Sequence, residues 1–112
     1  MVMNYRTAIT SLLLFSSIGF NVAEAGELAS GRMKVNAICQ TCHGLDGIGT
    51  IAGVPNLSGQ KKEYMVTQLK AFRSGRREHN QMSIIAQMLS DDDINNVSEW
   101  YSNIKITLEA PQ

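Results

Sequence analysis

Apolar residues recur at helical spacing in two separate stretches of the chain. Residues 27–38 contain few helix breakers and predict a first helix that runs into Cys39. Residues 61–74 predict a second helix, with Gly75 just beyond its end as a stop signal. The apolar stripes are Leu28, Val35 and Ile38 in the first helix, and Met65, Leu69 and Phe72 in the second. Each stripe gives its helix one face to bury.

The last part of the chain predicts another helix, with the clearest start signal in the sequence. Ser90 suits the N-cap position, residues 91–93 place carboxylates in the first turn, and Ser90 with Asp93 resembles a capping box. The buried stripe of this helix would be Ile94, Val97, Tyr101 and Ile104. Residues 84–89 predict a short helical turn before it, and the tail from Lys105 is expected to be loose.

Residues 44–60 contain too many turn formers for a long regular element. These are Gly44, Gly47, Gly49, Gly53, Pro55 and Gly59. We therefore expect a loop that wraps around something. No segment alternates apolar and polar residues as a half-buried strand does, and no internal repeat is present. The pattern as a whole predicts an all-α fold.

Residues 1–25 have the order of a secretory signal. A short basic start, residues 1–6, precedes an apolar run over residues 8–20 and then Ala23-Glu24-Ala25. A transmembrane anchor is the alternative, but hydroxyl residues interrupt the run, which is shorter than the roughly 20 apolar residues that a span needs. Cleavage after Ala25 would leave residues 26–112 as one domain with no further segment able to cross a bilayer.

Composition narrows the classes of function. Lys and Arg together number 10, as do Asp and Glu, so the net charge is zero and no nucleic-acid partner is implied. A domain of this size buries a modest fraction of its surface, and large apolar residues are few, so a planar cofactor would supply missing core volume. Both cysteines stand in one pentapeptide, as either a disulfide or a cofactor anchor.

That pentapeptide, Cys-Gln-Thr-Cys-His at residues 39–43, has the spacing of a covalent haem attachment site. Two thiols about one helical turn apart can add to vinyl groups on one edge of a porphyrin, and His43 then directs its imidazole at the iron. A structural zinc site would need more ligands, and the predicted mature segment offers only His79 besides. A thioredoxin-like pair of Cys39 and Cys42 is the other alternative, but such pairs usually sit at a helix N-terminus after a strand.

The predicted mature segment resembles the class I cytochromes c, most closely the cytochrome c553 type and a single half of the dihaem cytochrome c4 type. Four ordered blocks carry the resemblance. They are residues 39–44 (Cys-Gln-Thr-Cys-His-Gly), residues 55–60 (Pro-Asn-Leu-Ser-Gly-Gln), Tyr64 with residues 68–75 (Gln-Leu-Lys-Ala-Phe-Arg-Ser-Gly), and Met82 with Ala86 and residues 89–94 (Leu-Ser-Asp-Asp-Asp-Ile). The resemblance implies the class I cytochrome c fold, with helices around one haem c per chain, bound covalently through Cys39 and Cys42.

A six-coordinate haem needs a second axial ligand besides His43. From the residues alone, ligation by Met82 and packing of Met82 in the core are equally good accounts. The resemblance implies that Met82 is the ligand and that the carbonyl of Pro55 accepts the other N–H of His43. The methionines expected in the core are Met33, Met65 and Met88. The family commonly has a proline and a further methionine just after the ligand, where this chain has Ile84 and Ile85, and the departure bears on the rigidity of that loop.

The same likeness implies that Gly31 lies where the first helix crosses the last, with Trp100 or Tyr101 packed on it. His79 is expected to be an exposed loop residue rather than a ligand. A group of basic residues could steer an acidic redox partner or be an ordinary solvated face. It consists of Lys61, Lys62, Lys70, Arg73, Arg76 and Arg77.

The sequence thus predicts a soluble periplasmic monohaem c-type cytochrome that carries one electron, with His43 and Met82 as axial ligands, and that is not an enzyme. Its partners would be redox proteins, with no nucleic acid and no membrane span after cleavage of the signal. One alternative is a haem-bearing subunit of a larger redox enzyme such as a flavocytochrome c. The others are a haem sensor or peroxidase with an open sixth position, and a thiol oxidoreductase.

Overall fold

A computed structural model of the protein describes residues 22–112, and these residues form helices and loops without a strand. The elements are α1 (Val22–Lys34), the π-helical segment η1 (Val35–Cys39), α2 (Gln40–His43), α3 (Lys62–Ser74), α4 (Met82–Gln87) and α5 (Asp91–Ser102). The predicted all-α class is confirmed. Most of the predicted secretory signal, residues 1–21, lies outside the described residues.

The first helix differs from its prediction at both ends. It begins at Val22, within the segment predicted to be a signal. Its predicted last turn is π-helical, over Val35–Cys39. A π-helical turn adds a residue to the turn of an α-helix. No residue type specifies such a turn, so apolar spacing alone predicts a plain α-helix there.

The later helices have the predicted boundaries to within a few residues. Before α5, the Oγ of Ser90 accepts the N–H of Asp93 at 3.0 Å, and the Asp93 carboxylate accepts the N–H of Ser90 at 3.1 Å, which completes the capping box. Burial opposes ionisation of Asp93, but hydrogen bonds from Ser90 and Lys34 prevail and hold its pKa below the usual value. Gly75 ends α3 in the left-handed region, at φ 77°.

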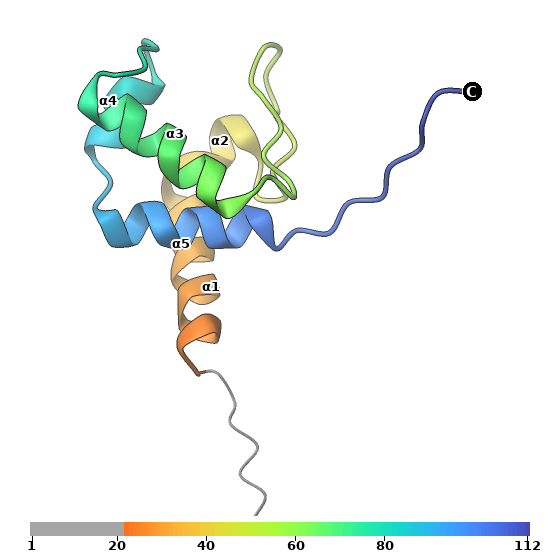
Figure 1. Cartoon of the computed structure of the whole chain (residues 1–112), viewed down its shortest axis with the longest axis horizontal. Coiled ribbons are helices and arrows are strands. Elements are labelled where there is room, and N and C mark those ends of the chain that lie inside the picture. Colours follow the sequence, from red (N-terminus) through yellow and green to blue (C-terminus); the bar gives the residue numbers. More distant parts are fainter. Residues whose placement is uncertain (1–21) are drawn as a thin grey trace, which may run out of the picture.

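Helix α1 crosses α5, as Figure 1 shows, and its N-terminal half projects to one side of α5. The remaining elements, α2, α3, α4 and the loop of residues 44–60, lie on the other side. At the crossing, a Cβ on Gly31 would lie 2.1 Å from the carbonyl oxygen of Asn96 and 3.1 Å from the Cβ of Trp100. The expected role of Gly31 is therefore seen directly: the α5 backbone occupies the space of its missing side chain.

The core lies between α1, α3 and α5 and extends to α4. One buried cluster contains Val35, Met65, Val97 and Tyr101, with Leu69, Trp100 and Ile104 packed against it. Phe72, Ala86, Leu89 and Ile94 are also buried. The guanidinium of Arg73 ties α3 to the start of α5, because it donates to the carbonyl of Leu89 at 3.0 Å and pairs with Asp91.

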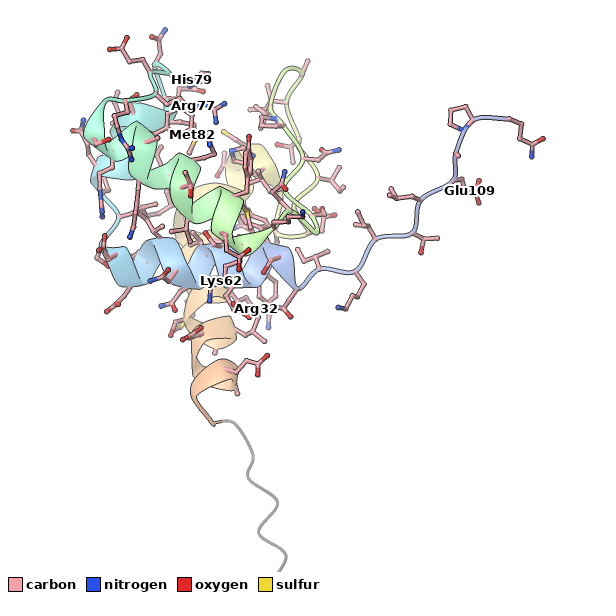
Figure 2. All side chains as sticks on the ribbon, in the orientation of Figure 1. Arg32, Lys62, Arg77, His79, Met82 and Glu109 are labelled. Carbon is pink, nitrogen blue, oxygen red and sulfur yellow. The ribbon has the colours of Figure 1, made fainter. Side chains whose placement is uncertain are left out.

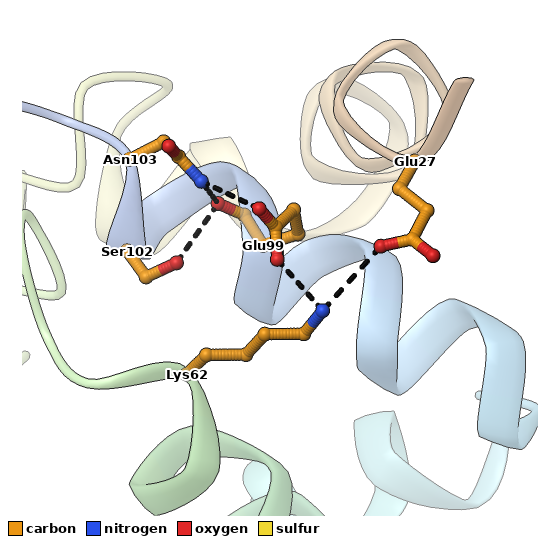
Figure 3. A network of polar contacts seen from close by, with 5 residues as sticks. All are labelled: Glu27, Lys62, Glu99, Ser102 and Asn103. Carbon is orange, nitrogen blue, oxygen red and sulfur yellow. Dashed lines mark hydrogen bonds and ion pairs between the residues drawn. The ribbon is translucent and has the colours of Figure 1, made fainter. Parts of the chain in front are cut away.

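A polar network joins the start of α3 to both α1 and α5 (Figure 3). The Nζ of Lys62 lies 2.7 Å from the carboxylate of Glu99 and 3.4 Å from that of Glu27. The side-chain amide of Asn103 donates to Glu99 Oε1 at 2.7 Å and to the Glu99 carbonyl at 2.9 Å. The Lys62 hydrogen bond, followed by that from Asn103, lowers the pKa of Glu99 against the effect of burial.

No helix in residues 22–112 is long and apolar enough to span a bilayer. The last residues leave the helical body as an extended tail (Figure 1), in which Ile106 and Leu108 are exposed. Ile104, predicted as part of the buried stripe of α5, lies just beyond that helix and still packs against the core.

Candidate functional site

The cysteine and histidine motif runs along one continuous helical path. Cys39 ends η1, while Cys42 and His43 end α2. Both cysteines are free and half-buried. Residues three apart on a helix share a face. The backbone therefore presents both thiols on one side, as attachment to a single planar group requires.

Cys39 packs against the core cluster that contains Val35 and Tyr101. Burial raises the pKa of its thiol to about 11, and the nearby charge of Lys34 offsets only part of that effect. The thiol is therefore protonated at neutral pH. Redox-active cysteine pairs depend on a lowered thiol pKa, so the environment of Cys39 argues against a thiol oxidoreductase.

His43 is buried, with 9% of its surface exposed. Its Nδ1 lies 3.0 Å from the carbonyl oxygen of Pro55. A carbonyl can only accept, so Nδ1 carries the proton in this contact and Nε2 keeps its lone pair. This arrangement fixes the tautomer and the direction of the ring, as an acceptor behind a metal-bound histidine does.

The glycine-rich loop supports the motif from behind. The Oγ1 of Thr50 donates to the carbonyl of Thr41 at 2.7 Å, and its N–H donates to the carbonyl of Cys42 at 2.8 Å. These carbonyls lie at the end of α2, where no intrahelical partner remains for them. Sequence reasoning did not single out Thr50, because a threonine in such a loop has no spacing or composition that marks it.

Two aromatic residues of α5 hold the start of this loop. The Nε1–H of Trp100 donates to the carbonyl of Leu45 at 2.8 Å, and the hydroxyl of Tyr101 donates to the carbonyl of Gly44 at 2.9 Å. The N–H of Gly59 donates to the carbonyl of Tyr101 at 2.9 Å at the other end of the loop. Both ends of the loop are thus fixed to α5, and the contact between Pro55 and His43 is held in between.

Met82, the predicted second ligand, belongs to a separate element. It is the first residue of α4 and is half-buried. Figure 2 labels it at the same end of the molecule as Arg77 and His79. Helix α4 packs on α3. Met82 is therefore positioned by the turn before α4 and not by the motif helix.

The prediction that two other methionines lie in the core is wrong. Met33 and Met88 were predicted in the core, but they are 67% and 55% exposed. Met33 is two residues from both Gly31 and Val35, and so points away from the face that contacts α5. Met88 caps the C-terminus of α4. Met65, the third, is buried as predicted.

The basic group on and around α3 is partly neutralised. Lys62 pairs with Glu99 and Glu27, while Lys70 and Arg73 both pair with Asp91. The free positive charge of this surface is therefore smaller than the sequence indicates, which weakens the interpretation as an electrostatic docking face.

The residues present fit a haem better than a bare metal ion. The donors of the motif are two thiols on one helical face and an imidazole nitrogen left free by Pro55, and the predicted further ligand is the thioether of Met82. Neutral nitrogen and thioether ligands suit haem iron. Residues 22–112 contain no group of three or more His, Cys, Asp or Glu side chains placed to hold a metal ion.

Comparison with known proteins gives one family. Residues 28–105 match the profile described as "Cytochrome c". Cytochrome c-554(548) of Halomonas halodenitrificans is 40% identical over 82 residues, which cover 70% of this chain and 98% of that protein. Cytochrome c4 of Pseudomonas aeruginosa is 30% identical over 100 residues, which cover 89% of this chain and 49% of that protein.

A solved structure agrees with the sequence matches. Reduced recombinant cytochrome c4 from Pseudomonas stutzeri superposes with a TM-score of 0.65 at 28% identity, over 72% of this chain and 50% of the other. This chain thus spans nearly the whole of the c-554(548) relative but about half the length of the c4 relatives. The similarity covers the motif, the loop and the helices around them.

Proposed function

This chain belongs to the cytochrome c family, and on that premise we propose that it is a periplasmic monohaem electron carrier with His43 and Met82 as axial ligands. The cofactor of the family is haem c, held by the Cys-x-x-Cys-His motif that this chain has at Cys39, Cys42 and His43. When bound, haem supplies a one-electron couple between ferric and ferrous iron.

The single observation that carries the proposal is the contact between His43 and Pro55. It leaves Nε2 as the only ring nitrogen of His43 able to bind iron, and the loop that supplies Pro55 is anchored to α5. A ligand fixed in this way needs little reorganisation when the charge on the iron changes. Cys39 and Cys42 would bind the cofactor covalently, so it stays with the chain through each cycle.

Met82 would complete the coordination. A thioether is a soft neutral ligand that favours the ferrous state and raises the reduction potential relative to a second histidine. If His43 and Met82 both bind the iron, no position would be left on it for a substrate. The protein then transfers electrons between redox partner proteins and catalyses no reaction of its own.

The periplasmic location is supported by the order of residues 1–25, which is basic, then apolar, then Ala-Glu-Ala. Expression of the full chain in a bacterium with a haem-attachment system should give a protein that is released with the periplasmic fraction. Mass spectrometry should place its N-terminus at Gly26 and add the mass of one haem. A protein retained in the membrane fraction with residues 1–25 intact would contradict this part of the proposal.

The ligand assignment is tested with Met82→Ala, and Met88→Ala is the matched control on the same element. In the oxidised protein we expect a weak near-infrared band from sulfur bound to iron, absent in Met82→Ala and kept in Met88→Ala. The reduction potential should fall, and the reduced variant should bind carbon monoxide. Retention of the band in Met82→Ala would exclude Met82 as the ligand, and haem removed by acid–acetone extraction would exclude covalent attachment.

A further inference from the structure

The start of α4, the helix that begins with Met82, lacks an ordinary cap. The preceding residue, Gln81, has helical backbone angles (φ −91°, ψ −48°), and its side chain caps nothing. The first amides of any helix have no partner within the helix. Those at the start of α4 must therefore find an acceptor elsewhere, and the side chain that provides it also fixes the backbone from which Met82 extends.

His79 provides that acceptor. Its Nδ1 lies 3.3 Å from the backbone nitrogen of Gln81 and 3.3 Å from that of Met82. Backbone amides only donate, so Nδ1 is the acceptor of both, and the ring proton is on Nε2. Two weak hydrogen bonds thus converge on one nitrogen, in the place where serine or asparagine usually caps a helix.

The backbone of His79 is held by the same first turn. Its N–H donates to the Oγ of Ser83 at 3.0 Å, and its carbonyl accepts the N–H of Ser83 at 3.0 Å. His79 and Ser83 therefore exchange hydrogen bonds across the start of α4, with Met82 between them in sequence. As in a capping box, the side chain of the first residue accepts amides of the helix start while a later side chain accepts its N–H; here the imidazole accepts from Gln81 and Met82, and Ser83 accepts from His79.

The ring of His79 is also fixed against α3. It meets the buried ring of Phe72 edge to face, with centroids 6.4 Å apart and planes at 72°. The guanidinium of Arg77 lies 4.5 Å from the centroid of the same Phe72 ring. Figure 2 shows His79, Arg77 and Met82 together at this end of the molecule. The acceptor nitrogen is thus oriented from α3.

We propose that His79 is a positioning residue for Met82: its Nδ1 caps the first turn of α4 and so fixes the backbone that carries the axial thioether. The inference rests on the proposed function, since it assigns His79 a role only if Met82 is a ligand. His79 is an exposed loop residue, as the sequence predicted, and the inference adds a role to that position. Loss of the cap would free two amides and let the first turn of α4 open, and the Met82 sulfur would leave the iron more often.

Three substitutions at residue 79 separate the loss of the hydrogen-bond acceptor from the loss of ring packing on Phe72. His79→Ala removes both, His79→Phe keeps a ring against Phe72 without an acceptor, and His79→Asn restores an acceptor of the type preferred at helix caps. Met82→Ala shows the signal of complete ligand loss. Each is prepared as the haem-loaded protein. The measurements are the near-infrared sulfur band, the reduction potential and the rate at which carbon monoxide binds the reduced form.

We expect His79→Ala and His79→Phe to weaken the near-infrared band, lower the potential and speed carbon monoxide binding by about tenfold, the size that loss of a helix cap predicts. His79→Asn should return all three toward the parent values. A purely structural role would lower the unfolding temperature and leave these signals unchanged.

The failures of the two proposals are distinguishable. If Met82→Ala abolishes the band while His79→Ala and His79→Phe leave band, potential and rate unchanged, the positioning role is overturned and the ligand assignment stands. The same holds if His79→Asn behaves like His79→Ala. If Met82→Ala itself keeps the band, the ligand assignment fails, and the role of His79 fails with it.

Discussion

Among single residues, Gly31 determines how closely α1 approaches α5. The carbonyl oxygen of Asn96 lies 2.1 Å from the position that a Cβ at residue 31 would take. That atom belongs to the backbone and cannot rotate away as the end of a flexible side chain can. Any side chain at residue 31 must therefore push the two helices apart and disturb Val35 and Trp100, which pack at the same crossing.

We predict that Gly31→Ala lowers the free energy of unfolding by about 1–3 kcal/mol, the range for overpacked sites. Denaturant unfolding of the haem-loaded protein, followed by far-ultraviolet circular dichroism, measures the loss. Met33→Ala is the control, because it changes an exposed side chain on the same helix. Equal stability of Gly31→Ala and Met33→Ala would contradict the interpretation.

Some residues of the site could be predicted from the sequence and others could not. Cys39, Cys42 and His43 follow from spacing alone, because the chemistry requires adjacent positions on one helix. Pro55 required a family resemblance, since many prolines serve only turns. Thr50 could not be found at all, because its role comes from the path of the loop. Met33 was misplaced in the core because apolar character does not tell which face of a helix is covered.

Among the helices, the network around Lys62 joins α1, α3 and α5 through one ammonium group. The hydrogen bond between Lys62 and Glu99 is the main cause of both shifts: it raises the pKa of Lys62 and lowers the pKa of Glu99. The contribution of this pair to stability is complete above the pKa of unfolded Glu, about 4.3, and below that of unfolded Lys, about 10.4. It is lost as pH falls through the lowered pKa of Glu99 or rises through the raised pKa of Lys62.

We therefore predict that Lys62→Met lowers the free energy of unfolding by about 1 kcal/mol at neutral pH. The difference from the parent should shrink as the pH falls through the lowered pKa of Glu99. Unfolding in urea across the pH range measures this difference in stability, because urea is uncharged and does not screen the ion pair. Lys61→Met is the control, because Lys61 forms no ion pair with the part of the chain that the structure describes. A difference that stays the same down to the most acidic pH at which the protein folds would show that lost packing, not the pair, is the cause.

Helix boundaries were predictable where a local signal marks them. Ser90 with Asp93 and Gly75 act through contacts with their neighbours in sequence, so the start of α5 and the end of α3 are found correctly. The π-helical turn over Val35–Cys39 has no such signal. It forms where α1, packed at Gly31, must also present Cys39 to the core, and that requirement is tertiary.

For the whole molecule, the described core is small. The buried hydrophobic residues are Val35, Met65, Phe72, Ala86, Leu89, Ile94, Val97 and Tyr101. A core of this size gives limited stability, and small domains commonly need a metal or another cross-link. A covalently bound haem would supply both apolar surface and a link between α2 and α4.

Removal of the cofactor should therefore unfold the chain. We predict that the double variant Cys39→Ala with Cys42→Ala carries no covalent haem and loses most of its helical circular dichroism signal. Met82→Ala is the control, because it keeps both thioether bonds and should keep most of the helix. Helix content in the double variant equal to that of the loaded parent would show that protein contacts alone hold the fold.

The contact between α1 and α5 can form only after the last helix has been synthesised. The two helices are the first and the last elements of the described sequence, so the contact at Gly31 cannot form until residues 96–100 are available. A chain that is synthesised, or translocated, from its N-terminus presents residues 39–43 long before that point. During that interval both thiols lie on a segment without its final neighbours, and Cys39 is not yet covered by the core that later packs against it.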